Sequence, residues 1–330
     1  MDSDVGRRTV LGSLVGAGAL AATAASAANS SQPAPSPPTE LPRAWTRARR
    51  FAIWPGEAPG AADFRPQPLP ERWSPSFLRN TRSPSLHLFG PHTSNGGALL
   101  VIPGGGYEFV SIANEGVDVA ARMCPLGYTV FVLDYRLPGE GWRNAPDVPL
   151  QDAQRAMRFI RSGARGFGVD PARISVIGFS AGGHLAASLA TGFAERVHEP
   201  SDGADRLDAR PDAAALIYPV VTMTQPYTHA GSRRFLLGSS PSDQLVAARS
   251  PEQHVTAALP PLFLAHACDD PAVPVENSLM LLAAARAARR PVEAHLFQEG
   301  GHAFGVGRPG TPSAEWMPLL HLWLQRTLSR

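Results

Sequence analysis

Short continuous runs of apolar residues alternate along this chain with longer segments whose apolar residues recur every three or four positions. Uninterrupted apolar runs are typical of strands that are buried on both faces. We expect such strands at residues 98–102, 129–133, 174–177, 213–218, 261–265 and 293–297. The amphipathic segments predict helices at residues 117–123, 152–165, 181–191, 278–288 and 316–328. Strands and helices in alternation predict an α/β fold, in which a mostly parallel central sheet has helices on both faces.

Two stretches interrupt this alternation. Residues 45–83 are rich in Pro, Arg and Trp and show no clear periodicity, so we expect loops there with at most a short edge strand. Residues 220–254 lie between two predicted strands. We expect them to pass over the edge of the sheet and to shape a binding pocket.

The beginning of the chain has the pattern of an export signal. Arg7 and Arg8 precede a weakly apolar run, rich in Ala and Gly, and Ala25-Ser26-Ala27 offers a small-residue cleavage site. The paired arginines resemble a twin-arginine signal, which carries folded proteins across the bacterial inner membrane. The apolar run is too short to predict a membrane span. An uncleaved anchor and a disordered start are the alternatives.

These features divide the chain into three parts. Residues 1–27 are assigned to a twin-arginine-type signal peptide, and residues 28–44 to a Ser/Pro-rich linker. Residues 45–330 then form the α/β domain. We expect a periplasmic or secreted protein with no stable insertion in a membrane after the signal is cleaved.

Composition narrows the classes of function. With 44% hydrophobic and 18% charged residues the chain can build a large core, and its formal net charge of +2 gives no basis for binding nucleic acid. Cys124 and Cys268 are too few for a disulfide scaffold and lack the spacing of a zinc site. We expect two separate buried thiols, with a disulfide in an oxidising compartment as the alternative.

Gly178-Phe179-Ser180-Ala181-Gly182 stands between the strand predicted at 174–177 and the helix predicted at 181–191. A G-x-S-x-G sequence at such a junction is typical of a sharp turn in which a side chain at either flank would clash. Ser180 would then lie above the carboxyl edge of the sheet, at the positive end of the helix, where developing negative charge is favoured. We therefore predict that Ser180 is a nucleophile.

A serine hydroxyl needs a base, and the chain has ten histidines. Where a G-x-S-x-G turn carries the nucleophile, the acid and then the histidine follow it along the chain. His302 follows the last predicted strand and two glycines, which is the position expected for the base. We expect His184 to be a packing or helix-surface residue and His266 a hydrogen-bonded core residue. His229 and His254 lie in residues 220–254, and nothing in the sequence singles them out.

The acid that orients the imidazole should follow the strand predicted at 261–265. Asp269 and Asp270 stand together there. The pattern H-G-x-x-D followed by x-x-V-P selects Asp270, which lies four residues after His266 and four before Pro274. Asp269 is the alternative acid, and otherwise a turn residue that caps the loop.

Pro103-Gly104-Gly105-Gly106-Tyr107 follows the strand predicted at 98–102. The tetrahedral intermediate of acyl transfer needs backbone N–H donors already in place, and glycines let several amides point at one position. The N–H of Ala181, directly after the nucleophile, would be a further donor. An ordinary glycine turn is the alternative. A phosphate loop is excluded because the required lysine and third glycine are missing.

Five motifs in this order resemble the bacterial esterase branch of the α/β hydrolases. That branch includes acetylxylan-esterase-like and feruloyl-esterase-like proteins and is similar to the hormone-sensitive-lipase group. The resemblance extends from Trp45 to the end of the chain. The motifs are Ile102-Pro103-Gly104-Gly105-Gly106-Tyr107, Asp134-Tyr135-Arg136-Leu137, Gly178-Phe179-Ser180-Ala181-Gly182-Gly183-His184-Leu185-Ala186, residues 269–278 and residues 300–305.

The resemblance implies the α/β-hydrolase fold for the domain, and it implies that Gly105 and Gly106 join Ala181 in the oxyanion hole. The chain departs from the lipase group in three places. Pro103 replaces the histidine that opens the H-G-G-G loop, Phe179 replaces a frequent Asp, and Ala267 replaces the glycine of H-G-x-x-D.

We expect Ser180, His302 and Asp270 to hydrolyse a carboxylic ester through an acyl-enzyme, with no metal and no organic cofactor. The resemblance and the export signal together imply a short acyl group, acetyl above all, on a plant-wall polysaccharide or its fragments. The substrate is then a small ester or an acylated saccharide. Tyr107, Trp142 and Tyr218 are candidates for lining its pocket, with burial in the core as the alternative.

Three other functions fit the same fold. A serine peptidase of the prolyl-oligopeptidase type has the same order of residues, but the chain before Ser85 is too short for its usual propeller. A lipase for long acyl chains would need a lid, and residues 220–254 are short for one. A non-catalytic binding protein would not need every catalytic position to be filled. The sequence does not predict an oligomeric state.

Overall fold

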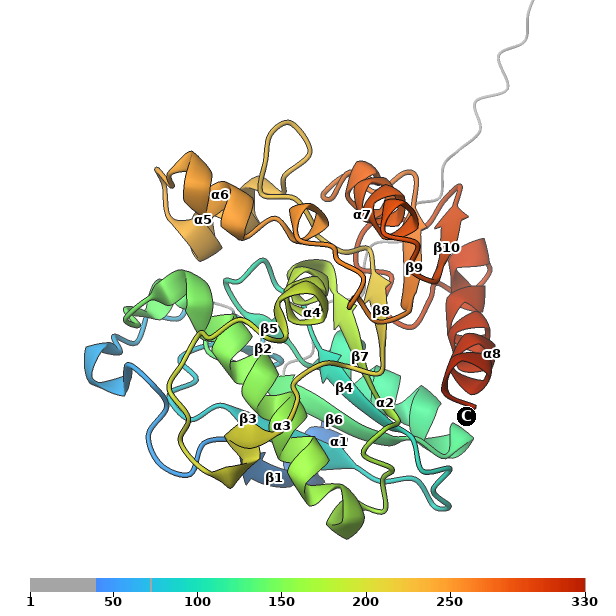
Figure 1. Cartoon of the computed structure of the whole chain (residues 1–330), viewed down its shortest axis with the longest axis horizontal. Coiled ribbons are helices and arrows are strands. Elements are labelled where there is room, and N and C mark those ends of the chain that lie inside the picture. The colour runs from blue at the N-terminus through green and yellow to red at the C-terminus, as the bar shows by residue number, and fades with distance from the viewer. Residues whose placement is uncertain (1–39, 72, 330) are drawn as a thin grey trace, which may run out of the picture. The chain divides into compact units, whose positions relative to one another are not determined.

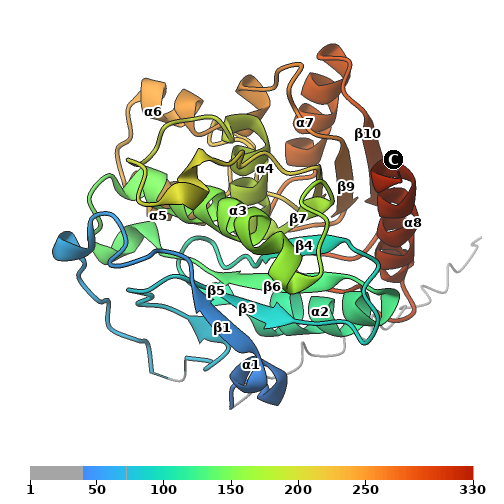
Figure 2. The same ribbon diagram turned by 60° about the horizontal axis from the view of Figure 1, so that its bottom comes forward.

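A computed structural model describes residues 40–71 and 73–329 of the chain. Within this part of the chain, eight strands form one sheet, which Figures 1 and 2 show from two directions. The strands are β1 (Arg49–Ala52), β3 (Ser85–Phe89), β4 (Ala98–Ile102), β6 (Thr129–Asp134), β7 (Ile174–Phe179), β8 (Ala213–Ile217), β9 (Leu262–Ala267) and β10 (Val292–Phe297). Their order across the sheet is β1-β3-β6-β4-β7-β8-β9-β10. From β6 to β10 neighbouring strands are parallel, whereas β1 and β3 run antiparallel at one edge. The predicted mostly parallel sheet is confirmed.

Helices cover both faces of this sheet, as the sequence predicts. Every residue of β4, β6, β7 and β8 is buried, which explains their continuous apolar runs. The helices form two groups, one on each face of the sheet (Figure 2). The first group is α3 (Val148–Phe167), α4 (Ser180–Gly192) and α7 (Glu276–Ala287), and the second is α2 (Asp118–Met123) and α8 (Trp316–Leu328). None of the helices among the described residues is both long and apolar enough to cross a bilayer.

The segment between β8 and β9 leaves the sheet, in line with the excursion predicted at residues 220–254. It carries two short helices, α5 (Ala230–Leu237) and α6 (Asp243–Ala248), which lie above α4 in the view of Figure 1. Asn277, a buried residue of α7, anchors the start of this segment to that helix. Its Oδ1 accepts hydrogen bonds from the N–H groups of Val221 (2.8 Å) and Thr222 (3.1 Å).

The N-terminal region contains more regular structure than its composition indicates. α1 (Arg43–Arg47) precedes β1, which is the short edge strand that the sequence allowed for. β2 (Phe77–Leu78) pairs with β5 (Val110–Ser111) in a second, two-stranded sheet. Residues 1–39 lie outside the described residues. The signal peptide at residues 1–27 and the linker at 28–44, apart from its described residues 40–44, therefore stay predictions; α1 begins within the last two residues assigned to the linker.

The two cysteines are both free thiols. Cys124 is half-buried, and its thiol donates a 3.4 Å hydrogen bond to the carbonyl of Phe89. Burial raises the pKa of Cys124 to about 11. Cys268 is exposed, because it stands in the turn after β9 rather than in the strand. The expectation of two buried thiols is therefore wrong for Cys268.

A buried ion pair joins the end of β6 to α3. The guanidinium of Arg136 lies 2.7 Å from Asp152 Oδ1, and neither side chain is exposed to solvent. The indole N–H of Trp54 donates to the same oxygen at 2.9 Å. Because both charges are paired and hydrogen bonded, the chain can keep them in its core.

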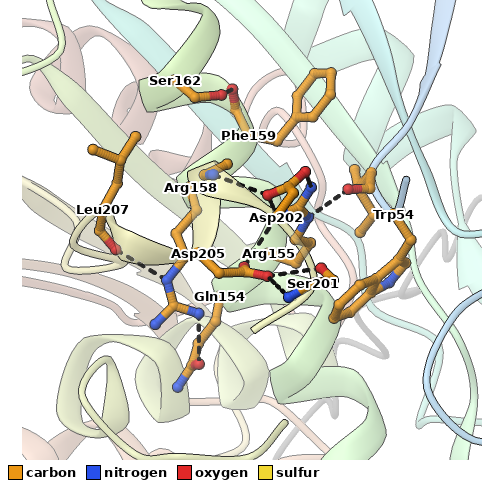
Figure 3. A network of polar contacts seen from close by, with 12 residues as sticks. Trp54, Gln154, Arg155, Arg158, Phe159, Ser162, Ser201, Asp202, Asp205 and Leu207 are labelled. Atoms are coloured by element: carbon orange, nitrogen blue, oxygen red, sulfur yellow. Dashed lines mark hydrogen bonds and ion pairs between the residues drawn. The ribbon is translucent and has the colours of Figure 1, made fainter. Parts of the chain in front are cut away.

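Arg155, two turns from the start of α3, holds two distant segments against the helix (Figure 3). Its Nε donates to the carbonyl of Ile53 at 2.6 Å. Its terminal nitrogens pair with Asp202 at 2.5 Å and with Asp205 at 3.0 Å, and the arginine side chain is only 3% exposed. One side chain thus fixes both the N-terminal region and the loop before β8.

Candidate active site

The G-x-S-x-G pentapeptide forms the sharp junction that its sequence predicts. β7 ends at Phe179 and α4 begins at Ser180, whose φ is 51°. A Cβ on Gly182 would overlap the carbonyl oxygens of Ile102 and Pro103, so only glycine allows α4 to approach the loop after β4. This close packing places Ser180 beside that loop in a left-handed conformation that costs energy in any residue but glycine.

Three side chains from three strand ends form one line of hydrogen bonds. Ser180 Oγ lies 2.9 Å from His302 Nε2, and His302 Nδ1 lies 2.7 Å from Asp270 Oδ2. Because a carboxylate only accepts, Nδ1 carries the proton and Nε2 is free to accept the one from Ser180. Ser180 is 6% exposed, the His302 side chain 20% and the Asp270 side chain 0%. The structure therefore brings together the three residues that the sequence selects.

Asp270 is surrounded by donors. His266 Nε2 lies 3.2 Å from its Oδ2, and the N–H groups of Ala272 and Val273 donate to its Oδ1, each at 2.9 Å. Burial raises the pKa of Asp270, but the hydrogen bonds from His266 and His302 and the charge of His302 outweigh it and hold the pKa far below its usual value. The carboxyl group is thus kept ionised.

Asp269, the alternative acid, has a different partner. Its Oδ1 accepts a 2.8 Å hydrogen bond from the N–H of Gly301, next to His302. Its side chain faces the loop rather than the imidazole, which matches the alternative of a residue that caps the loop. Asp270 is the carboxylate that contacts His302.

The glycine-rich loop after β4 faces the same place. Gly105 and Gly106 have φ values of 129° and 65°, and a Cβ on Gly105 would overlap the carbonyl oxygen of Phe109. Among the described residues, nothing accepts a hydrogen bond from the N–H of Gly105 or Gly106. Ala181 is the second residue of α4, so its N–H has no acceptor within the helix. These three amides are the predicted oxyanion donors, whereas the Gly104 N–H is occupied by Glu115 at 2.7 Å.

The three aromatic residues considered for the pocket are all buried. Tyr107, Trp142 and Tyr218 are 1%, 3% and 0% exposed. The Tyr107 hydroxyl donates to His184 Nδ1 at 2.7 Å, and Trp142 packs in a small cluster with Ala61 and Val148. The structure therefore favours the core alternative for these side chains, and it places only the ring of Tyr218 against His302, with centroids 5.0 Å apart.

Two further histidines, His184 and His229, differ in where they lie. His184 is buried, and its Nε2 donates to the carbonyl of Arg249 at 2.9 Å; burial and the charge of Arg249 lower its pKa to about 4. It is a packing residue, as expected. His229 caps α5 through Ser232, and its Cε1 would lie 3.9 Å from a Cβ on Gly106. His229 therefore lies beside the glycine-rich loop, a placement that the sequence did not reveal.

His266 is a hydrogen-bonded core residue, as predicted, and its Nε2 also contacts Asp270. Glu115 was not predicted, although its carboxyl group is buried beside Gly104. The H-G-x-x-D spacing was a signal for His266. A single glutamate within an amphipathic stretch carries no such signal. Among the described residues, no three His, Cys, Asp or Glu side chains are grouped as metal ligands.

Comparison with known proteins identifies the family. The family model BD-FAE matches residues 86–284. The chain is 38% identical over 208 residues to endo-1,4-beta-xylanase B of Butyrivibrio fibrisolvens, covering 63% of this chain and 32% of that protein. It is 30% identical over 223 residues to an acetylxylan esterase of Xylanibacter ruminicola, covering 66% and 43%. The chain thus spans about a third of the length of the first relative and less than half of the length of the second.

A solved structure matches over a greater share of both chains. An acetyl ester-xyloside bifunctional hydrolase from Caldicellulosiruptor lactoaceticus superposes with a TM-score of 0.72 at 32% identity. The match covers 85% of this chain and 96% of that one. The chain therefore belongs to the BD-FAE family and has the α/β-hydrolase fold.

Proposed function

We propose that this protein is a serine carboxylesterase that hydrolyses short-chain esters, acetyl esters above all, of plant-wall polysaccharides or their fragments. The observation that carries the proposal is the line of hydrogen bonds from Ser180 through His302 to Asp270, beside amides without an acceptor. This is the arrangement that acyl transfer requires.

In the acylation step, His302 Nε2 removes the proton from Ser180 as Oγ attacks the ester carbonyl. The N–H groups of Gly105, Gly106 and Ala181 donate to the oxygen on which negative charge develops. Asp270 keeps the proton of the imidazole on Nδ1 and stabilises the imidazolium that forms. The imidazolium then protonates the departing alcohol, which leaves an acyl group on Ser180.

In the deacylation step, His302 removes a proton from a water molecule that attacks the acyl-enzyme. The same amides hold the second oxyanion, and the imidazolium returns its proton to Ser180 Oγ as the acid leaves. The ester and one water molecule, together with the residues of the chain, balance these steps. The low pKa of Asp270 is consistent with this cycle, because the carboxylate must stay ionised next to the imidazole.

The choice of substrate rests on the relatives. One of them is named acetylxylan esterase, and the solved structure with the TM-score of 0.72 is named an acetyl ester-xyloside hydrolase. An acylated saccharide is therefore the proposed substrate. The predicted signal at residues 1–27 supports a periplasmic or secreted enzyme that meets such saccharides outside the cytoplasm.

The direct test compares the purified protein with Ser180→Ala on p-nitrophenyl acetate, butyrate and palmitate. We expect the acetate to be hydrolysed fastest and Ser180→Ala to lose at least about 10³-fold in kcat. Ser188→Ala, on the same helix, is the matched control and should retain full activity. Activity that survives in Ser180→Ala would overturn the mechanism.

The natural substrate is tested by the release of acetate from acetylated xylan and from acetylated xylose. Faster release from either than from p-nitrophenyl acetate, measured as kcat/KM, would support an acylated saccharide. Preference for palmitate would indicate a lipase, and cleavage of a proline-containing peptide would indicate a peptidase. A wild-type protein without hydrolase activity on any of these would fit a binding protein.

A further inference from the structure

Glu115 is a buried acid that the proposed reaction does not use. It lies in the π-helical turn Ala113–Val117, which follows β5, and is 3% exposed. Its Oε2 accepts the N–H of Gly104 at 2.7 Å, and its Oε1 accepts the hydroxyl of Tyr218 at 2.8 Å. One carboxyl group therefore joins the glycine-rich loop after β4 to the residue that follows β8.

Tyr218 extends this connection to the loop that carries His302. Its hydroxyl oxygen accepts the N–H of Gly305 at 3.1 Å, and its ring packs against His302 and Phe304 with centroids 5.0 and 4.5 Å away. Hydrogen bonds thus run from Gly104 through Glu115 and Tyr218 to Gly305. They link the loop of the predicted oxyanion donors with the loop of the base.

Gly104 also packs against the nucleophile. A Cβ on Gly104 would come within 2.9 Å of Ser180 Cβ and 3.1 Å of Glu115 Oε2. Gly104 is therefore packed closely against both Glu115 and Ser180. A shift of the carboxyl group by a fraction of an ångström would be passed directly to the amides that follow Gly104.

A carboxyl group in this position is costly for the fold. Burial raises the pKa of Glu115 more than its hydrogen bonds from Tyr218 and Gly104 lower it. No arginine forms an ion pair with it among the described residues, in contrast to Asp152. An apolar side chain would avoid the cost of desolvation, so packing alone does not account for a glutamate here.

The two loops need an external link because their own backbones are pliable. Gly105 and Gly106 in one loop, and Gly301 and Gly305 in the other, all have positive φ. Glycines in such conformations lose much freedom on ordering and restrain their neighbours little. Oxyanion donors, however, must be held within about 0.5 Å of the productive geometry.

We propose that Glu115 is a positioning residue that sets the distance between the oxyanion donors and His302 through Gly104 and Tyr218. The inference rests on the esterase function proposed above. Glu115 touches neither the ester nor the water in this scheme. Its loss should weaken the binding of the transition state and leave the binding of the ester in its ground state largely unchanged.

The first test replaces the carboxyl group by the isosteric amide. Glu115→Gln keeps one acceptor, for the N–H of Gly104, but presents an NH2 group to Tyr218. That NH2 group can only donate to the Tyr218 oxygen, which already accepts from Gly305, so the Tyr218 proton loses its acceptor and this link is weakened. We expect kcat on p-nitrophenyl acetate to fall about 10- to 100-fold while KM changes by less than about threefold. The inhibition constant of a trifluoromethyl ketone, whose adduct places an oxyanion in the hole, should rise by the same factor as kcat/KM falls.

Glu140→Gln is the matched control. Glu140 is also buried, at 1% exposed, and also accepts a backbone N–H, from Asn80 at 2.6 Å, but it lies in the turn Pro138–Glu140 and has no contact with the triad. It should lose stability without losing kcat. Equal kcat values for Glu115→Gln, Glu140→Gln and wild type would overturn the proposal.

Tyr218→Phe tests the hydrogen bonds that the Tyr218 hydroxyl makes with Glu115 and Gly305. It tests the proposal even where Glu115→Gln does not fold. It removes one hydroxyl and keeps the ring against His302. We expect kcat to fall about 3- to 30-fold. The double variant with Glu115→Gln should lose less than the product of the two single losses, because both act through one chain of contacts. An unchanged kcat in Tyr218→Phe, or full additivity, would overturn the proposal.

Different outcomes would overturn the positioning role of Glu115 and the proposed esterase function. Wild-type protein that neither hydrolyses the esters nor reacts with a p-nitrophenyl phosphonate would overturn the esterase function itself. Wild-type activity together with unimpaired Glu115 and Tyr218 variants would overturn the positioning role alone.

Discussion

Two neighbouring carboxylates, Asp270 and Asp269, position His302 in different ways. Asp270 contacts its Nδ1, while Asp269 accepts the N–H of the preceding Gly301. The first contact concerns the proton and the second the position of the loop. Adjacent residues of the same type therefore have separable roles, which substitution by the isosteric amide should reveal.

Asp270→Asn should lower kcat/KM on p-nitrophenyl acetate by about 10³- to 10⁴-fold, because an amide N–H facing Nδ1 favours the wrong tautomer of His302. Asp269→Asn should lose less than about fivefold, because an amide oxygen still accepts from Gly301. Steady-state kinetics on both variants checks this. The reverse order of the two losses would show that Asp269 is the acid.

At the scale of the elements, α3 fixes the N-terminal region to the sheet. Asp152 pairs with Arg136 at the end of β6, and Arg155 binds the carbonyl of Ile53. Arg155 also pairs with Asp202 in the loop before β8 (Figure 3). The packing of α3 against the sheet and the N-terminal region thus depends on charged side chains on the buried side of the helix. Such pairs are costly to break from one side only, because the remaining charge stays in the core.

Asp152→Asn should reduce the free energy of unfolding by about 3–5 kcal/mol, since Arg136 is left without a counter-charge at 0% exposure. Glu199→Gln is the control, because its pair with Arg196 is exposed, and the loss there should stay below about 1 kcal/mol. Urea unfolding followed by tryptophan fluorescence measures both. Equal losses would contradict the view that burial decides the contribution.

The elements differ in how far the sequence reveals them. β4 begins and ends where its apolar run does, because a strand covered on both faces admits few polar residues. Apolar runs do not encode strand direction, so the antiparallel edge formed by β1 and β3 could not be predicted. Ser180, Asp270 and His302 were predicted because each follows a strand with turn residues beside it.

The rest of the site depends on polar contacts between residues far apart in the chain. Tyr218 and Glu115 are separated by 103 positions, and nothing around either residue marks the other as its partner. The same holds for Tyr107, whose hydroxyl is satisfied by His184, 77 positions away. Aromatic residues near a strand end can face the core or a pocket, and only the packing of the whole chain decides.

At the scale of the whole molecule, buried titratable groups make stability depend on pH in opposing ways. Burial lowers the pKa of His184 to about 4, whereas a histidine in the unfolded chain titrates near its usual pKa of 6.5. Its contribution is fully present above pH 6.5 and is lost as the pH falls towards 4, because the unfolded chain takes up the proton first. Burial raises the pKa of Asp134 to about 7, which favours the folded state as the pH falls through the same range.

His184→Gln separates the two effects. The variant keeps one acceptor and one donor for Tyr107 and Arg249 but does not titrate. Between pH 6.5 and 4, the free energy of unfolding of wild type should fall relative to that of the variant by about 1.4 kcal/mol per pH unit. Urea unfolding at a series of pH values measures the difference. Parallel curves for the two proteins would contradict a buried neutral imidazole.

The strand order has a consequence for how the candidate site is assembled while the chain is being synthesised. β7, β8, β9 and β10 are consecutive along the chain and adjacent in the sheet, so each strand can join the edge left by the one before. Ser180 is synthesised 122 positions before His302, which follows β10 in the chain, so the hydrogen bond between them can form only after β10 has been synthesised. A nascent chain therefore carries Ser180 without its hydrogen-bond partner until β10 and the loop that follows it have been made. Hydrolysis of a chromogenic ester would measure only the fraction of chains in which Ser180 and His302 are both in place. Circular dichroism measures the helix and strand content of complete and incomplete chains alike.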